Sequence, residues 1–273
     1  MKPNPIRISL VIPAYNEEAF LPALLQSVEA ARQRYVHGAD RIEVIVGDNL
    51  STDRTAAIAR EFGFRAVPVE KRCIGAVRNG GAMVATGEIL CFIDADSRID
   101  PETFNAVDAA MQAGKVSIGA TGVVPDRSSA GIRVTIAIFE FIGRLMGLDT
   151  GVIFCRREDF VAIGGYDETR LAAEDVDFLF RLKAYGRQRG RHFVRLPAVR
   201  AVTSARKFDT HGDWHALRRS SRHLAIAFRQ EELRPLRQEL LVRCALRLGA
   251  RTVLSCASSG TRLKPAIPGA HRR

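Results

Sequence analysis

Short apolar runs alternate with segments of helical periodicity through the first hundred residues, and few folds accommodate that alternation. Residues 6–12, 42–46, 65–69 and 88–93 are runs rich in β-branched side chains, each of a length typical of a buried strand. Helical spacing fills the intervals at 16–34, 56–62 and 75–86. Strands separated by helices form a parallel sheet covered on both faces. The sequence therefore predicts an α/β fold with a mostly parallel sheet flanked by helices.

The second half of the chain is less regular. We expect strands at 116–124, 150–156 and 193–196, and helices at 132–147 and 175–185. The stretch 215–255 is basic and predicted to be helical, and Gly, Pro, Ser and Arg dominate after residue 258. We predict a domain over 1–214 with a first half (1–97) and a mixed second half (98–214), then a basic helical tail (215–257) and a disordered end (258–273).

Charge is distributed unevenly along the chain. Residues 1–180 carry 19 basic and 25 acidic side chains, whereas residues 181–273 carry 22 basic and 5 acidic ones. Such a tail either faces an anionic surface or is simply solvated. Between Arg237 and Val253 an apolar helical face is flanked by Arg243, Arg247 and Arg251, as in interfacial helices. This pattern predicts peripheral attachment to anionic membranes, and packing of the helix on its own domain is the alternative.

Several classes of protein do not fit the composition. The most apolar window, residues 132–148, carries Arg133, Glu140 and Arg144, so no membrane span is expected. The five cysteines include no CxxC pair, which indicates neither a disulfide framework nor a zinc site. The residues before Pro13 lack the features of a signal peptide. We expect a cytoplasmic protein, peripheral at the inner face of the cytoplasmic membrane if the tail binds lipid.

Polar side chains follow three of the predicted strands. Asn16 and Glu17 follow the first strand, Asp48 and Asn49 the second, and the triplet Asp94-Ala95-Asp96 the fourth. Ligands of open α/β sheets bind outside the carboxyl ends of the strands, so these groups are predicted to share one edge. Two carboxylates at i and i+2 can approach one point and suit a hard divalent cation. Such a triplet by itself also occurs as an ordinary turn cap.

Basic and acidic groups elsewhere could complete such a site. Arg72, Arg78 and Asn79, and the Arg206 of Ser204-Ala205-Arg206-Lys207, could meet phosphate oxygens, or could lie on exposed faces. Glu174, Asp175 and Asp177 open a predicted helix, where acids are also favoured by the helix dipole.

The order of these motifs is more informative than any one of them. VIPAYNEE (11–18), VGDNLSTDRT (46–55), RNGGAMVATGEILCFIDAD (78–96), GGYDE (164–168), EDVDFLFRL (174–182) and TSARK (203–207) together resemble the family 2 glycosyltransferases of the GT-A fold, over about residues 6–214. The resemblance implies transfer of a hexose-type sugar from a nucleotide diphosphate donor to an acceptor hydroxyl with inversion, assisted by Mg²⁺ or Mn²⁺. A UDP-sugar donor and a lipid-linked or cell-envelope glycan acceptor are expected.

The resemblance also assigns roles to individual residues. It implies a nucleoside pocket lined by Pro13, Ala14, Tyr15 and Glu17, a D-x-D of Asp94, Ala95 and Asp96, and a catalytic base at Asp175. Within the D-x-D, Asp96 is expected to ligate the metal directly and Asp94 to lie nearer the ribose. The family often has two acids followed by Gly or Asn after the second strand, whereas this chain has Asp48, Asn49 and Leu50, so either Asp48 or Asn49 could accept a uracil N3–H. The third, histidine metal ligand of some members has only His211 as a weak match.

The resemblance implies that residues 1–97 bind the nucleotide sugar and that residues 98–214 form the acceptor and catalytic half. The acceptor is expected to enter between these two halves. The residues predicted on its side are Thr150, Gly151, the Gly165 of GGYDE, and Glu174. In-line attack requires the base to lie across the anomeric carbon from the leaving group.

Three other functions fit the sequence less well than glycosyl transfer. A nucleotidyltransferase would carry a GxGTR-type loop after the first strand, where this chain has PAYNEE. A nucleic-acid-binding protein would use the basic tail, but the tail has few aromatics and no recognisable motif, so no specific nucleic-acid partner is expected. A non-catalytic sugar-nucleotide-binding member would not need Asp94, Asp96 and Asp175 intact.

Overall fold

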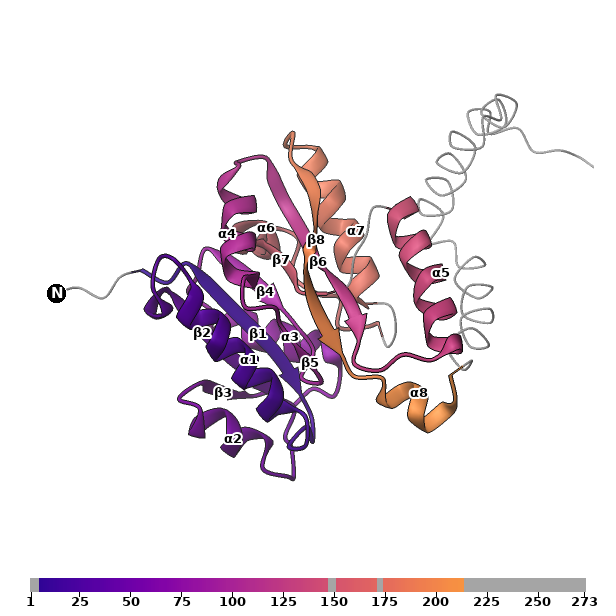
Figure 1. Cartoon of the computed structure of the whole chain (residues 1–273). Helices are drawn as coiled ribbons and strands as arrows, with labels where there is room; N and C mark the ends of the chain where they lie inside the picture. Colours follow the sequence, from indigo (N-terminus) through magenta and orange to yellow (C-terminus); the bar gives the residue numbers. More distant parts are fainter. Residues whose placement is uncertain (1–4, 147–150, 171–173, 214–273) are drawn as a thin grey trace, which may run out of the picture. The chain divides into compact units, whose positions relative to one another are not determined.

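The computed structural model describes residues 5–146, 151–170 and 174–213, which belong to one compact unit. An eight-stranded sheet runs through it in the order β3-β2-β1-β4-β7-β6-β8-β5 (Figure 1). The strands are β1 (Ile8–Ala14), β2 (Ile42–Asp48), β3 (Arg65–Pro68), β4 (Ile89–Phe92), β5 (Ser97–Arg98), β6 (Val116–Pro125), β7 (Ile153–Arg156) and β8 (His192–Thr203). The helices are α1 (Leu21–Arg34), a 3₁₀ turn η1 (Ala39–Arg41), α2 (Thr55–Glu61), α3 (Ile74–Met83), α4 (Thr103–Gln112), α5 (Ala130–Met146), α6 (Arg157–Ala162), α7 (Glu174–Arg187) and α8 (Arg206–His211).

The first half of the sheet is parallel, as the alternation of strands and helices predicts. Strand β1 pairs with β2 on one side and with β4 on the other, both in parallel register starting at Ile8. The order of strands therefore reverses between β1 and β4, which creates a topological switch point at their carboxyl ends. Beyond β4 the sheet is mixed, because β7 runs antiparallel to both β4 and β6.

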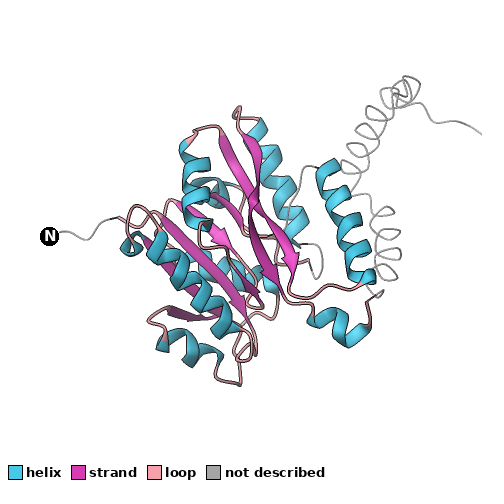
Figure 2. Cartoon of the chain, viewed as in Figure 1, coloured by secondary structure: helices cyan, strands magenta, loops and turns pink. Residues whose placement is uncertain are grey.

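Helices cover both faces of the sheet (Figure 2). One hydrophobic core contains Leu24 and Val28 of α1, Ile58 of α2 and Phe104 of α4, packed on alternate side chains of β1. The second core contains Ala82 of α3, Phe160 of α6 and Phe178 of α7 on the opposite face. Strand β1 is buried along its whole length, as expected for a central parallel strand covered on both sides.

Three local features differ from the sequence-based expectation. Helix α1 begins at Leu21 and not at residue 16, because residues 15–20 form a loop in which Asn16 adopts a positive φ of 53°. Strand β8 spans twelve residues, where the apolar pattern predicts four. Its pairing with β6 shifts register between Thr121 and Gly122, which breaks the alternation from which a strand is recognised.

Helices α4 and α6 and the two-residue strand β5 were not predicted. The long apolar helix predicted at 132–147 is present as α5. The predicted tail and disordered end lie outside the described residues. Within the described ranges, no helix is long and apolar enough to cross a membrane.

Candidate active site

The loops that follow β1 and β2 are bound to each other at the carboxyl edge of the sheet. The Ser51 hydroxyl accepts a hydrogen bond from the backbone N–H of Asn16 at 3.0 Å, and the Asn16 side-chain oxygen accepts one from the N–H of Thr52 at 2.9 Å. Asn16 and Leu50 have φ values of 53° and 55°, a region that non-glycine residues rarely adopt. Such backbone conformations cluster at functional sites, where the surrounding contacts hold them in place.

The side chain of Asn49 is oriented by its neighbours. Its Nδ2 donates to the backbone oxygens of Val69 at 2.6 Å and Lys71 at 3.1 Å. Two carbonyl partners require the nitrogen on that side, so the amide oxygen remains as the acceptor toward a ligand. Asp48 Oδ1 accepts the N–H of Ser51 at 3.3 Å, which engages that carboxylate in the turn itself.

Tyr15 and Arg72 meet beside this loop. The Arg72 guanidinium lies 5.7 Å from the centre of the Tyr15 ring, a cation–π distance, and the ring is 45% exposed. Pro13 and Ala14, the other residues expected at the nucleoside, are buried in the last two positions of β1. An exposed aromatic ring therefore stands where the strand ends.

The D-x-D triplet follows β4 directly. The Asp94 side chain is 51% exposed and that of Asp96 only 10%, while Ala95 between them is buried in the core. The backbone oxygen of Asp94 accepts the N–H of Ser97 at 3.1 Å, and that of Asp96 accepts the N–H of Ser204 at 3.1 Å. This turn fixes both carboxylates at the end of the strand.

Arg206 connects Asp96 to the loop after β1. Its Nη1 and Nη2 donate to the two carboxylate oxygens of Glu17 at 2.8 and 2.6 Å, and its Nε lies 3.0 Å from Asp96 Oδ2. The guanidinium also stands 4.7 Å from the centre of the Phe20 ring. The predicted phosphate-binding arginine is therefore held at the D-x-D, 189 residues along the chain from Glu17.

Arg78 connects the D-x-D to the second half of the chain. Its Nη2 donates to Asp94 Oδ1 at 2.8 Å and its Nη1 to Glu174 Oε1 at 2.9 Å. The arginine is 6% exposed, and its Nε is buried without a hydrogen-bond partner among the described residues. The guanidinium lies 5.1 Å from the centre of the Tyr166 ring. Arg78 is thus a buried bridge between two carboxylates rather than a group on an exposed helix face.

Asp175 lies in the first turn of α7, next to this bridge. It is half-buried, and its Oδ1 accepts the N–H of Val176 at 2.8 Å. Burial raises the pKa of Asp175, the negative charge of Glu174 raises it further, and the positive charge of Arg78 partly opposes both. A carboxylate with a raised pKa is a better proton acceptor than an ordinary aspartate.

Asn79 has a structural function in this fold. Its Nδ2 donates to Tyr166 O and to Glu168 Oε1, both at 2.9 Å, and its Oδ1 accepts the N–H of Tyr166 at 2.8 Å. Gly165 has a φ of 69°, and a Cβ there would lie 2.6 Å from Asn79 Oδ1. The amide of Asn79, which was expected to meet phosphate oxygens or to lie on an exposed helix face, is therefore committed to the GGYDE loop.

The residues expected on the acceptor side are only partly described. Gly151 is buried, and a Cβ there would lie 2.3 Å from Thr121 Oγ1, so its lack of a side chain has a packing cause. Glu174, also expected on the acceptor side, is buried and paired with Arg78. Thr150 and the side chain of His211 lie outside what the structure describes.

The carboxylates of the site fit a divalent cation that is also held by a diphosphate. Five carboxylates (Glu17, Asp94, Asp96, Glu174 and Asp175) surround two arginines, which leaves a formal excess of negative charge. Over the described ranges, no three His, Cys, Asp or Glu side chains are grouped as a metal site by themselves. Mg²⁺ is commonly bound through one or two carboxylates together with substrate phosphates. Asp94 and Asp96 fit that pattern, with the remaining ligands coming from a bound diphosphate.

Two aromatic residues of the site were missed by the sequence reasoning. Tyr166 stacks on Phe178 with ring centres 3.9 Å apart, and its buried hydroxyl has no hydrogen-bond partner in the described part of the chain. Phe20 supports Arg206. The GGYDE motif is a sequence signal for Tyr166, but nothing local distinguishes Phe20 from the apolar residues of α1 that follow it.

A parallel sheet with a switch point, carboxylates at its carboxyl edge and a mixed second half define a GT-A type α/β protein. The chain belongs to glycosyl transferase family 2, whose family model matches residues 9–157. The match ends before α7, so it covers the loops after β1 and β2 and the D-x-D but not Asp175.

Curated relatives match part of the chain. The 4,4'-diaponeurosporenoate glycosyltransferase of Staphylococcus haemolyticus is 38% identical over 112 residues, which is 38% of this chain and 28% of the relative. The undecaprenyl-phosphate 4-deoxy-4-formamido-L-arabinose transferase of Pseudomonas fluorescens is 34% identical over 131 residues, 44% of this chain and 37% of the relative. The chain therefore matches about a third of these relatives' own lengths.

Solved structures share the fold. S. aureus TarS 1–349 in complex with UDP superposes with a TM-score of 0.60 at 21% identity, covering 93% of this chain and 76% of that one. Glucosyl-3-phosphoglycerate synthase from Mycobacterium tuberculosis, in complex with Mn²⁺, UDP and glucosyl-3-phosphoglycerate, gives a TM-score of 0.55 at 20% identity, covering 78% and 77%. At these identities the likeness concerns the architecture.

Proposed function

We propose that the protein is an inverting glycosyltransferase that moves a sugar from a nucleotide diphosphate donor to an acceptor hydroxyl. The observation that carries the proposal is the Arg78 bridge, which joins Asp94 at 2.8 Å and Glu174 at 2.9 Å. Through Glu174 it holds Asp175, the next residue, close to the D-x-D. A donor held at the sheet edge and a base on α7 are the two parts that in-line transfer needs.

A uridine nucleotide is the donor we favour. The free amide oxygen of Asn49 can accept a uracil N3–H, because its Nδ2 is already committed to Val69 and Lys71. Asp48 is the alternative acceptor, and its Oδ1 also accepts the N–H of Ser51 in the turn. The exposed Tyr15 ring with Arg72 behind it offers a surface on which the base can stack. TarS and the mycobacterial synthase are described in complex with UDP, which supports the same choice.

A divalent cation fits the D-x-D. Asp96, with Asp94, would hold Mg²⁺ or Mn²⁺, and the ion when bound would offset negative charge on the diphosphate. The mycobacterial synthase of the same fold is described with Mn²⁺. Arg206 lies at Asp96 Oδ2, 3.0 Å from its Nε, and can supply a further positive charge to the diphosphate.

The transfer step assigned to the chain's own residues is a proton abstraction coupled to substitution. Asp175 takes the proton of the acceptor hydroxyl while the acceptor oxygen bonds to the anomeric carbon. The bond from that carbon to the diphosphate oxygen breaks, and the electron pair leaves with the nucleoside diphosphate. Burial and the neighbouring Glu174 raise the pKa of Asp175 and so increase its strength as a base.

The class of acceptor is inferred from a relative, and the cellular location from the charge of the C-terminal residues. The Pseudomonas fluorescens relative is named for undecaprenyl phosphate, which supports a lipid-linked acceptor. The excess of basic residues after residue 180 supports attachment to an anionic membrane surface from the cytoplasmic side. Cosedimentation with anionic vesicles tests the membrane attachment. Equal pelleting of the full chain and of a chain ending at Asp213 would contradict an anchor in the tail.

The donor site is tested by thermal shift with UDP, GDP and dTDP sugars in the presence of Mn²⁺. Donor at about 100 times its Kd should stabilise the fold by about 2.7 kcal/mol. We expect the largest shift with a UDP-sugar, and its loss in EDTA or in Asp96→Ala. Undiminished binding in EDTA would contradict a metal at the D-x-D.

The base is tested by Asp175→Asn, which keeps the size of the side chain and removes the proton acceptor. Donor binding should be retained, and transfer should fall by at least about a hundredfold, the lower end of what general bases contribute. Asp177→Asn is the matched control, because Asp177 lies in the same helical turn and is paired with Arg181 at 2.7 Å. Sugar transfer at a near wild-type rate by the Asp175 variant would contradict the assignment of Asp175 as the base.

A further inference from the structure

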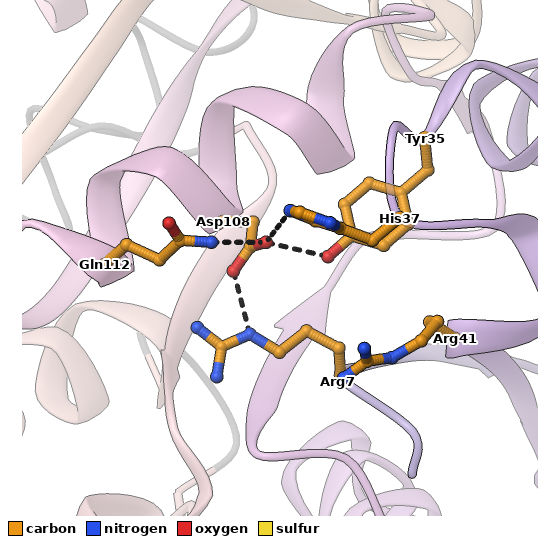
Figure 3. A pocket seen from close by; sticks show the side chains of 6 residues that line it. All are labelled: Arg7, Tyr35, His37, Arg41, Asp108 and Gln112. Atoms are coloured by element: carbon orange, nitrogen blue, oxygen red, sulfur yellow. Dashed lines mark hydrogen bonds and ion pairs between the residues drawn. The ribbon is translucent and has the colours of Figure 1, made fainter. Parts of the chain in front are cut away.

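A cavity lies away from the D-x-D, and Figure 3 shows the six side chains that line it. Arg7 and Arg41 lie immediately before β1 and β2, so the cavity is at the amino ends of these strands. Strand β1 is seven residues long, which places the two edges about 20 Å apart. The volume is about 300 Å³, at the small end of ligand pockets, and the lining side chains are Arg7, Tyr35, His37, Arg41, Asp108 and Gln112.

Asp108 is the acid of this cavity, and most of its hydrogen-bonding capacity is already used. It accepts from Arg7 Nε at 2.8 Å, from the Tyr35 hydroxyl at 2.8 Å and from Gln112 Nε2 at 3.0 Å, and His37 Nε2 lies 3.5 Å away. Figure 3 shows these four side chains converging on the carboxylate. A carboxylate has about four acceptor positions, so these three hydrogen bonds occupy most of the capacity of Asp108.

Arg41 is the second arginine of the cavity, and no ion pair to it is found among the described residues. Its Nε is buried without a hydrogen-bond partner, so only the outer nitrogens of the guanidinium can meet a ligand in the cavity. The charge of Arg7, by contrast, is offset by both Asp108 and Glu88. Arg41 is therefore a cation of the cavity to which the described residues supply no carboxylate partner. The 49% exposed side chain of His37 gives the cavity a second polar group open to solvent.

We propose that this cavity binds a small oxyanion of the phosphate class through Arg41, with His37 as a second donor. The guanidinium fork matches two oxygens of a phosphate, and charge-assisted hydrogen bonds of this kind are the strong ones. One uncompensated arginine next to a histidine suits an anion of one or two charges. The same chemistry is offered by free phosphate and by the headgroup of phosphatidic acid.

The test is calorimetric titration of the full-length protein with inorganic phosphate at constant ionic strength, without nucleotide or metal. We expect saturable binding to one site outside the D-x-D. Arg41→Gln should weaken it at least about tenfold, the loss expected for a charge-assisted pair. His37→Asn should weaken it less. The control Arg60→Gln changes an exposed arginine on α2 and should leave the affinity unchanged.

A second control separates this cavity from the proposed donor site, where phosphate could also bind. Arg206→Gln should leave the Arg41-dependent binding intact. Loss of phosphate binding in Arg206→Gln but not in Arg41→Gln would overturn the proposal without affecting the glycosyltransferase assignment. Equal affinity in wild type and Arg41→Gln, or no saturable binding, would also overturn it. If Arg41→Gln does not fold by circular dichroism, His37→Asn decides, because its side chain is half exposed.

Vesicles containing phosphatidic acid distinguish the two sources of the anion. Vesicle binding that depends on Arg41 and competes with free phosphate would assign the site to a lipid headgroup. Phosphate binding that depends on Arg41, with vesicle binding that does not, would assign it to a soluble anion. Either result supports the proposed site.

Discussion

The two edges of the sheet each hold an acid away from bulk water, but they surround it differently. At the amino edge, burial by itself would raise the pKa of Asp108, yet hydrogen bonds from Arg7 and Tyr35 outweigh burial and lower it. At the carboxyl edge, burial and the charge of Glu174 raise the pKa of Asp175, and Arg78 offsets only part of the effect. The first carboxylate is stabilised in its charged form and the second is not.

The difference separates a structural acid from a reactive one. Asp108 ties the start of β1, the end of α1 and helix α4 together, so its charge contributes to the stability of the fold. Asp175 is held beside a like charge, which costs stability and makes it a stronger base. Functional sites commonly retain such unfavourable arrangements, and the rest of the fold compensates for them.

The largest expected effect is that of Arg78→Ala, which removes the bridge between Asp94 and Glu174 at the carboxyl edge. Removing this arginine leaves Glu174 buried without its partner, and breaking a buried pair typically costs about 3–5 kcal/mol. It should also raise the pKa of Asp175 further, because the positive charge of Arg78 lowers that pKa. Urea unfolding at pH 7 measures the loss, with Arg60→Ala on the exposed surface as the control. A loss below about 1 kcal/mol would mean that the bridge is not structurally important.

Asp108→Asn should have a smaller effect, at the amino edge. Removing the charge should cost about 1.5–3 kcal/mol at pH 7, the range for hydrogen bonds to charged groups. Because the folded-state pKa is lowered, the contribution is present above the unfolded-state pKa of about 3.9 and is lost as the pH falls through the folded-state value. The difference between wild type and variant should therefore shrink on acidification.

Gln112→Ala is the companion to that measurement. It removes one neutral donor from Asp108 and should cost only about 0.5–1.5 kcal/mol. If the glutamine variant loses as much stability as Asp108→Asn, the charge of Asp108 is not what stabilises this edge.

The smallest expected effect has the opposite sign. Asp175→Asn should stabilise the protein at pH 7 by about 0.5–1 kcal/mol, because the amide carries no charge next to Glu174. The folded-state pKa of Asp175 is raised, so the destabilisation it causes is absent below the unfolded-state pKa and appears as the pH rises through the folded-state value. The gain should therefore disappear between pH 7 and pH 4. Melting curves across that range measure it, and a variant less stable than wild type at pH 7 would show that Asp175 is a structural acid like Asp108.

Local patterns were sufficient to predict the first half of the sheet and the position of its carboxylates. The apolar runs before Asp48 and Asp94 are continuous and bounded by turn residues, so their ends could be placed to within about two residues. The second half was harder. Strand β8 contains Pro197, several basic residues and a register shift, and its burial comes from β6 rather than from its own alternation.

The sequence by itself determined the class of fold and the edge at which the candidate site lies. Parallel strands of a βαβ chain all end at one edge, so carboxylates that directly follow strands are brought together by connectivity alone. Only the tertiary structure decided which charges are paired. Arg78 meets Glu174 across 96 residues and Arg206 meets Glu17 across 189, and no local pattern encodes such pairs. Burial and neighbouring charge set the behaviour of an acid, and both depend on how distant segments pack, which is why Asp108 and Asp175 differ.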